Sequence, residues 1–368
     1  MGKLQSSVTL QEISVKKFAL DSITAPRILY SQVYINENKK RSFTFLNTNN
    51  NSLYFYDFET LKLNKIIALS NTKSSKIEHA AAFHVKAPDS IYVYNKSSLE
   101  LLLINSKGNI LKIISLIGNH NLRKDPWFYK FPQYNPQAAN PFLEIDGELL
   151  FTGQYMESLP DTLIDKFKFM AHLDLKTNRV VYSHTYPRSL YGFNYNWEGQ
   201  VFTQVYTELN SDRDKIILSF PISHDLYISD LHSGEYKAVY GGSNEAGTIS
   251  SIGVSRKETS NSISKSHFMR NDEYGAIKYD KYRKVYYRFL RKSVPNGDEN
   301  TDIKKKMITV IILDENFNYV GEKTIGRSKN WFLENVFVTK EGLNIEYLED
   351  SINEDYLTLK IFTIKKNL

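Results

Sequence analysis

A pattern of two apolar runs joined by a polar turn recurs along this chain and constrains its fold more than any other feature. The first copy is Leu53 to Leu69, LYFYDFETLKLNKIIAL. Four more copies occupy residues 101–116, 169–185, 226–240 and 308–325. Each has an Asp or Asn near its bend, namely Asp57, Asn105, Asp174, Asp230 and Asp314. The pattern predicts repeated β-hairpins in which these polar residues form turns and are not catalytic acids.

The predicted strands need cover on both faces. Residues 53–56 and 101–104 are bulky without interruption, whereas a strand with one wet face alternates apolar and polar residues. No long segment has the apolar spacing of an amphipathic helix, so other sheets must supply the cover. Sheets repeated around an axis form a β-propeller. The alternative is a two-sheet sandwich, which usually closes within about 250 residues, and this chain has 368.

The predicted strands fall into six successive groups, and no linker divides them. We therefore expect one domain over residues 1–368. The last group has only three strands, and the segment 8–20 has no hairpin partner, so we expect this segment to pair with the C-terminal group. The prediction is an all-β, six-bladed β-propeller with four-stranded antiparallel blades, closed by the N-terminal strand. The expected blades are 28–70, 80–117, 141–186, 201–240, 273–325 and 335–364, with the closing strand at 8–20.

Charge and motifs exclude several function classes. The net charge of +6 arises from 47 basic and 41 acidic residues that are interspersed, whereas nucleic-acid-binding proteins carry clustered basic stripes. We expect no nucleic-acid partner. The segment Lys278 to Lys292, KYDKYRKVYYRFLRK, mixes basic and aromatic residues. Because Arg288 alternates with Tyr287 and Phe289, we interpret the segment as a solvated strand. No nucleotide-binding or GxSxG motif occurs.

The sequence also bears on compartment. No apolar run approaches the roughly 18 residues that span a bilayer, and the amino terminus lacks a signal-peptide core. We expect a soluble chain. The residues Met1 to Lys3 fit equally well a start placed after a removed export segment. There are no cysteines, which excludes disulfides, thiolate metal ligands and a cysteine nucleophile.

All three tryptophans lie in predicted links from an outermost strand to the next innermost strand, which emerge on one face of a propeller. These links are 118–140, 187–200 and 326–334. Their aromatic, amide and guanidinium groups suit a sugar, a peptide or another flat ligand. The alternative is that the rings seal gaps between blades and cap the channel. The candidate ligand-binding rim comprises Trp127, Tyr129, Tyr134, Tyr191, Asn194, Tyr195, Trp197, Arg327, Asn330 and Trp331.

Titratable residues give no catalytic or metal motif. Glu78, Glu198 and Glu334 fall near the rim, but their spacing identifies no acid–base pair. The histidines considered as ligands are His79, His84 and His120, and no HxH or HExxH spacing occurs. We therefore interpret them as ordinary polar residues and expect no metal site and no cofactor. The catalytic residues, if there are any, are unassigned.

The hairpins LYFYDFETLKLNKIIAL and HLDLKTNRVVYSHTY, together with the closing strand, resemble the TolB-like and NHL-like six-bladed propellers. More narrowly, the chain resembles an uncharacterised family of Bacteroidetes propeller lipoproteins, a domain-of-unknown-function family. The resemblance covers essentially the whole chain. It implies an extracytoplasmic protein of the periplasm or outer membrane, anchored by a lipidated cysteine that this chain lacks. It implies no functional residues.

Three functional hypotheses follow. The first is a non-catalytic binding or scaffolding propeller, exported and membrane-anchored, that holds a glycan, peptide or protein on its aromatic rim. The second is a hydrolase or lyase with its site at the channel mouth, either with or without a bound metal. The third is a purely structural component of an envelope complex.

Overall fold

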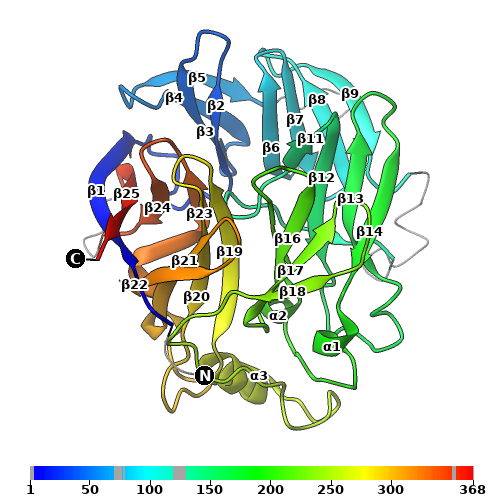
Figure 1. Ribbon diagram of the computed structural model, residues 1–368. Coiled ribbons are helices and arrows are strands. Elements are labelled where there is room, and N and C mark those ends of the chain that lie inside the picture. The colour runs from blue at the N-terminus through cyan, green and yellow to red at the C-terminus, as the bar shows by residue number, and fades with distance from the viewer. Residues whose placement is uncertain (1–3, 70–76, 78, 119–129, 350–353, 368) are drawn as a thin grey trace.

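The computed structural model describes residues 4–69, 77, 79–118, 130–349 and 354–367. Within these residues the chain forms five β-sheets that follow one another around the molecule in chain order (Figure 1). Strands that are consecutive in sequence pair with one another, and nearly all of the pairing is antiparallel. The fold is all-β, with only short helices between the sheets.

Three sheets have four strands each. The first consists of β2 (Ser31–Ile35), β3 (Arg41–Asn47), β4 (Ser52–Asp57) and β5 (Leu63–Ala68). The second consists of β6 (Ala80–Ala87), β7 (Ser90–Asn95), β8 (Glu100–Ile104) and β9 (Ile110–Ser115). The third consists of β15 (Tyr206–Leu209), β16 (Lys215–Ser219), β17 (Asp225–Asp230) and β18 (Lys237–Tyr240).

A five-stranded sheet lies between the second and third of these in the chain. It consists of β10 (Gln133–Tyr134), β11 (Leu143–Ile145), β12 (Glu148–Gln154), β13 (Lys168–Asp174) and β14 (Val180–Thr185). Both β10 and β11 pair with β12, at its two ends. The short strand β10 was not expected from the sequence.

The remaining sheet has eight strands and joins the two ends of the chain. It consists of β19 (Glu273–Asp280), β20 (Val285–Arg291), β21 (Met307–Asp314), β22 (Tyr319–Arg327), β1 (Val8–Ala19), β25 (Tyr356–Lys366), β24 (Leu343–Tyr347) and β23 (Trp331–Val338).

The N-terminal strand β1 pairs with the C-terminal strand β25, as the unpartnered segment 8–20 predicted (Figure 1). The pairing is antiparallel and runs from Val8 opposite Lys366 to Ala19 opposite Tyr356. The sequence did not predict the second contact of β1, a parallel pairing of Val8 with Gly321 on β22. A side chain at Gly321 would have its Cβ 1.9 Å from the Val8 carbonyl oxygen, so only glycine permits this approach.

The polar residues at the hairpin bends form turns, as predicted. The Asp174 carboxylate accepts hydrogen bonds from the backbone N–H groups of Lys176 and Thr177, at 2.8 and 2.9 Å. Equivalent bonds hold the turns at Asp57, Asn105 and Asp314. Asp230 differs, because its carboxylate instead pairs with the ammonium of Lys215 at 2.6 Å.

The hydrophobic core lies between the faces of neighbouring sheets. Phe18 of β1 packs against Phe43 of β3 with ring centroids 4.6 Å apart and is fully buried. Burial of a phenylalanine of this kind contributes roughly 1.5–3 kcal/mol. The strands β4 and β8 are covered on both faces, whereas the outer strands β5, β9 and β18 are mostly exposed. The uninterrupted apolar runs are therefore explained by sheets that cover both faces.

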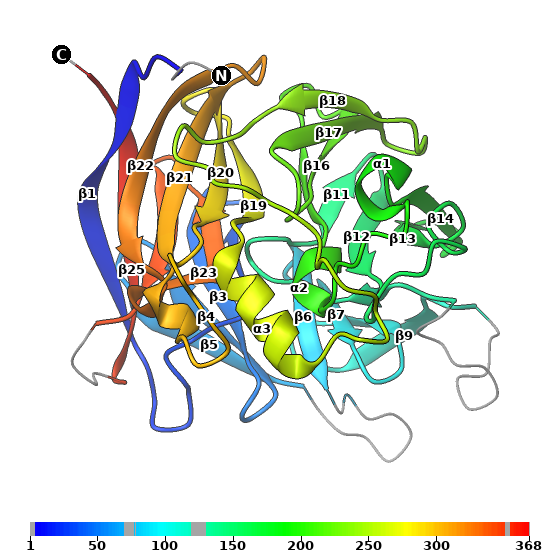
Figure 2. The same cartoon turned by 90° about the horizontal axis from the view of Figure 1, so that it is seen from below.

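The structure has helices where the sequence predicted none. The helix α3 (Asn261–Arg270) lies in the link between β18 and β19, and the Ser260 hydroxyl caps it by accepting from the Ile263 N–H. The short helix α2 (Gln200–Thr203) replaces the start of the strand predicted from residue 202. Figure 2 shows α2 and α3 close together, and the Phe202 and His267 rings are in contact. No helix among the described residues is long and apolar enough to cross a membrane.

The interpretation of Lys278 to Lys292 as a solvated strand was wrong. Arg288 is fully buried, and Lys278 is 5% exposed. The strand β20 lies between β19 and β21 in its sheet. The β15–β18 sheet packs against the face of β20 that was expected to be exposed to solvent. The Arg288 guanidinium donates hydrogen bonds to this neighbouring sheet, for example to the Ser219 hydroxyl at 3.0 Å.

Candidate functional site

A cavity of about 450 Å³ opens where four of the sheets meet, and we call it the mouth cavity. Its walls come from residues at or just before the first strands of the sheets and from turns at the same ends of the sheets. The cavity thus brings together segments that are distant in the sequence. The described lining residues are Leu29, Thr48, Asn51, His79, Ala80, Ala81, Lys96, Asn135, Pro136, Gln137, Gln154, Gln200, Val201 and Gln204.

Side-chain amides dominate the polar lining of the mouth cavity. Six of the described lining residues carry one, and none of them carries a carboxylate. The six are Asn51, Asn135, Gln137, Gln154, Gln200 and Gln204. An amide offers both a donor and an acceptor without a net charge. The cavity therefore provides matched hydrogen-bonding groups for a neutral polar ligand.

Some of these amides are held in place by the protein. The Gln154 amide donates to the Gln200 carbonyl at 3.0 Å, and the Asn51 amide donates to the Ile77 carbonyl at 2.7 Å. In the described part of the chain, no hydrogen bond engages the side-chain amides of Gln137 or Gln204. Fixed groups thus alternate with groups that remain open to a ligand.

Lys96 supplies the ammonium group of the cavity lining. Its Nζ donates to the Asn135 side-chain oxygen at 2.5 Å. Desolvation lowers the pKa of Lys96 from its ordinary value. The bond orients the Asn135 amide, so its NH₂ group points away from the ammonium and its oxygen is already occupied.

A smaller cavity shares Gln137 and Val201 with the mouth cavity and contains an ion-paired arginine. The Arg291 guanidinium pairs with Glu273 and with Glu334, each at 3.2 Å. Burial opposes the charge on Arg291, but the two carboxylates raise its pKa overall. Glu334, which the sequence placed near the rim, therefore belongs to a charge network beside the mouth cavity.

A family model for a domain of unknown function, DUF4221, matches residues 7–324 of this chain. The chain belongs to the DUF4221 family. A solved DUF4221 member from Bacteroides vulgatus has the same fold with a TM-score of 0.80 and 21% identity, over 99% of this chain and 100% of that one. A Bacteroides fragilis structure, named as a presumed exported protein, is similar with a TM-score of 0.54 and 13% identity, over 97% and 96% of the two chains. No curated protein matches the chain.

Four of the candidate rim residues have buried rings in this DUF4221 chain. The Trp197 and Trp331 side chains are 8% and 7% exposed, and their indole N–H groups donate to the carbonyls of Leu190 and Ile325. Tyr134 and Tyr191 are each 1% exposed. Because these rings lie in hydrophobic clusters between sheets, their positions favour the alternative in which aromatic residues seal the gaps.

None of the four other candidate rim residues that the structure describes lines the mouth cavity. Asn194 and Tyr195 are exposed in the loop after the short helix α1 (Arg188–Tyr191), and Arg327 is exposed at the end of β22. Asn330 donates its amide to the Leu348 carbonyl at 3.1 Å. Trp127 and Tyr129 lie outside the described residues. The binding role of these six remains a prediction.

The histidines considered from the sequence have different surroundings. His84 pairs with Glu144 at 2.7 Å, as an ordinary polar histidine would. His79 is exposed and lines the mouth cavity. His120 and Glu78 lie outside the described residues, and Glu198 is half-buried away from the cavity lining.

Sequence reasoning missed the amides of the mouth cavity. Gln137 and Gln200 lie in links that the strand order had assigned to one face, and Gln204 follows directly. The signal that could have found them is an amide a few residues before or after the start of an inner strand. Tryptophan is rarer and drew attention to Trp197 and Trp331, whose buried rings serve packing.

Proposed function

We propose that this DUF4221 chain is a non-catalytic binding protein that holds a neutral, hydrogen-bonding ligand, a glycan or a peptide segment, in the mouth cavity. The amide lining of that cavity is the observation that carries the proposal. Its volume falls within the roughly 300–1,000 Å³ of small-molecule sites. The site differs from the aromatic rim expected from the sequence, but it lies among the same links.

We further propose that the fold is a six-bladed β-propeller. The eight-stranded sheet divides naturally into two four-stranded units, β19–β22 and β23–β25 with β1, which one residue pair joins. Hydrophobic clusters lie between successive sheets, and one of them joins Phe18 and Leu357 to Phe43 and Tyr54. That cluster links the last unit to the first, which supports a closed ring.

The binding proposal is stronger than the hydrolase or lyase alternative at this site. General acid–base chemistry requires titratable groups that converge on a bond, and the described lining supplies only Lys96 and the exposed His79. The carboxylates of the neighbouring smaller cavity, Glu273 and Glu334, are engaged by Arg291.

We propose an extracytoplasmic location, with anchoring by a lipidated cysteine encoded outside this sequence. The proposal draws on the resemblance to Bacteroidetes propeller lipoproteins and on the name of the Bacteroides fragilis structure. Fractionation of cells that express the full gene product checks it. Recovery of the protein in the cytoplasmic fraction would refute it.

Calorimetric titration with a panel of neutral oligosaccharides and a panel of uncharged hexapeptides tests the binding proposal. We expect one class to bind, and Gln204→Ala to weaken its affinity about fivefold, because one hydrogen bond is worth about 1 kcal/mol. Gln204 is half-buried with its amide unengaged in the described structure, so this change should leave the melting temperature nearly unaltered.

Two further variants make this test specific. Gln11→Ala, on the exposed face of β1, is the matched control and should bind like the wild type. Tyr195→Ala tests the exposed part of the aromatic rim. Binding that depends on Tyr195 but not on Gln204 would reject the mouth cavity as the site.

A further inference from the structure

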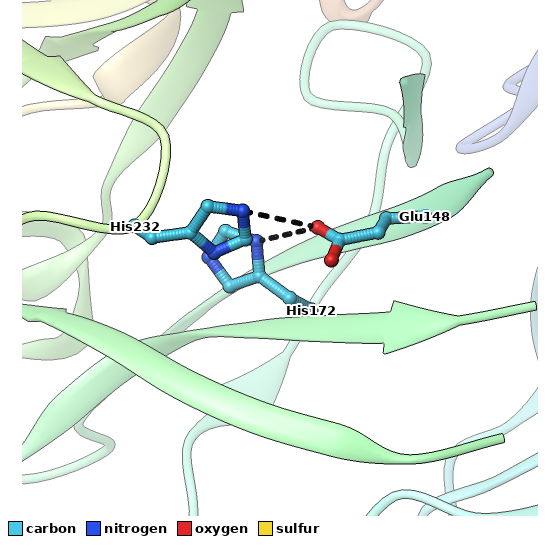
Figure 3. A group of neighbouring side chains, drawn as sticks. All are labelled: Glu148, His172 and His232. Atoms are coloured by element: carbon cyan, nitrogen blue, oxygen red, sulfur yellow. Dashed lines mark ion pairs between the residues drawn. The ribbon is translucent and has the colours of Figure 1, made fainter. Parts of the chain in front are cut away.

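Glu148, His172 and His232 converge between the β10–β14 sheet and the β15–β18 sheet (Figure 3). Glu148 begins β12, His172 lies on the adjacent strand β13, and His232 lies in the turn between β17 and β18. One carboxylate oxygen of Glu148, one ring nitrogen of His172 and one ring nitrogen of His232 all lie within 4.8 Å of one another. Both imidazole rings therefore point at the same carboxylate, although they come from different sheets.

The two separations between a histidine nitrogen and the Glu148 carboxylate match those of ligands around one small cation. His172 Nδ1 and His232 Nε2 each lie 3.4 Å from the same Glu148 oxygen, Oε2. Two ligand atoms at about 2.0–2.1 Å from a tetrahedral zinc ion are about 3.4 Å apart. The two histidine rings are tilted by 35° to each other, with centroids 4.5 Å apart.

His172 is held by a second layer of hydrogen bonds. Its Nε2 bonds to the Ser183 hydroxyl at 2.7 Å, and this hydroxyl bonds to His184 Nδ1 at 2.6 Å. When His172 donates from Nε2, its Nδ1 lone pair points into the cluster. Metal-binding histidines are commonly oriented in this way through their other nitrogen.

The His172 Nδ1 atom is a buried polar atom that makes no hydrogen bond within the described structure. The His172 side chain is only 1% exposed. A buried polar atom without a partner costs about 1–3 kcal/mol, and a cation would supply the missing partner.

We propose that Glu148, His172 and His232 bind a zinc-class divalent cation that ties the β10–β14 sheet to the β15–β18 sheet. Two histidines and one carboxylate form a donor set suited to zinc, with water as the fourth ligand. His232 is 57% exposed at its side chain, so the cation and the water can enter from solvent. The site is separate from the mouth cavity and does not depend on ligand binding there.

Titration of the chelator-treated full chain with ZnCl₂, followed by calorimetry and thermal unfolding, tests the proposal. We expect one equivalent to bind and the melting temperature to rise by a few degrees, because a cation that binds only the folded state stabilises it. With CoCl₂ as the probe, we expect the visible absorption of four-coordinate cobalt.

Variants assign the binding to these residues. His232→Ala and Glu148→Gln should each abolish the thermal shift, and both side chains are exposed enough for the fold to survive. Ser183→Ala should weaken zinc binding about tenfold or more through loss of the bond that orients His172. His79→Ala, at the exposed histidine of the mouth cavity, is the matched control and should bind zinc like the wild type.

Failure of the wild type to bind zinc or cobalt would overturn the proposal. Binding that persists unchanged in both His232→Ala and Glu148→Gln would also overturn it, because the cation would then lie elsewhere. Loss of binding in His79→Ala alone would assign the cation to the mouth cavity and would equally reject the site proposed here.

Discussion

The β15–β18 sheet meets its two neighbours through polar groups of opposite character. On one side, Arg288 of β20 reaches into this sheet and uses all five of its N–H donors. On the other side, His232 faces Glu148 and His172 in a cluster where His172 Nδ1 has no hydrogen bond. One junction is complete within the chain, and the other leaves a lone pair directed at a shared space.

The difference teaches how a structural polar group can be distinguished from a candidate binding group. Arg288 donates to four backbone carbonyls and one hydroxyl, and its guanidinium lies 3.8 Å from the Tyr274 ring centroid. Burial lowers its pKa to about 10, so it stays charged at neutral pH. Arg288 therefore has no N–H donor left to bind a ligand. Burial and unusual pKa alone therefore do not indicate function, whereas an unsatisfied and convergent donor set does.

The largest effect is expected when the complete junction is broken. Arg288→Met would remove one donor from each of four backbone carbonyls and from the Ser219 hydroxyl, at a cost of about 3–5 kcal/mol. Urea unfolding measures this loss of stability as a lower urea concentration at the unfolding midpoint. Arg179→Met, at an exposed arginine in the β13–β14 turn, should change stability by no more than about 0.5 kcal/mol. A similar, small effect at both arginines would contradict the structural role of Arg288.

An intermediate effect is expected at the incomplete junction. Ser183→Ala removes the hydroxyl that links His172 and His184, which should cost about 1–3 kcal/mol in the absence of added metal. The matched control is Ser229→Ala on β17, whose buried hydroxyl has no hydrogen-bond partner in the described structure. Thermal unfolding of both variants measures the difference. Equal losses would mean that the Ser183 bonds contribute no stability of their own.

The smallest effect is expected at a third, partly exposed junction, where Glu144 of β11 meets His84 of β6. The hydrogen bond from His84 lowers the pKa of Glu144 to about 2 in the folded state, below its ordinary 4.5. The stabilisation is therefore fully present above pH 4.5 and is lost as pH falls toward 2. After allowance for solvent screening, we expect this contact to contribute about 1 kcal/mol to the free energy of unfolding.

Urea midpoints at pH 6 and pH 3 measure the contribution of Glu144. The Glu144→Gln variant should lose less stability than the wild type between these two pH values, by about that 1 kcal/mol. An identical loss in the two proteins would show that Glu144 contributes nothing to the acid sensitivity of the fold.

Much of the strand layout could be predicted because it is written in local patterns. Apolar runs joined by Asp-containing turns located most strands, and the unpartnered segment at 8–20 correctly predicted the pairing of β1 with β25. The six-bladed count remains a prediction. The helix α3 was missed because residues 261–270, NSISKSHFMR, carry no apolar stripe that packing would reveal.

The candidate sites were much less predictable. The sequence singled out Trp197 and Trp331 as binding residues, yet both indoles are buried with their N–H groups bonded to backbone. It also assigned Arg288 to solvent, because strand alternation does not reveal whether a second sheet covers the other face. The proposed metal ligands His172 and His232 are sixty residues apart on different sheets, where no short spacing can signal them.

The sequence alone determined that this chain forms twisted, apolar strands in hairpins, since side-chain size and turn residues act within a few positions of each other. It also determined the pairing of the two ends, because an unpaired strand needs a partner strand for its backbone hydrogen bonds. Only the tertiary structure decided which polar groups meet. Gln137 and Gln204 share a cavity, and Glu148, His172 and His232 share a point in space, because the rotation between neighbouring sheets brings together residues that have no local relation.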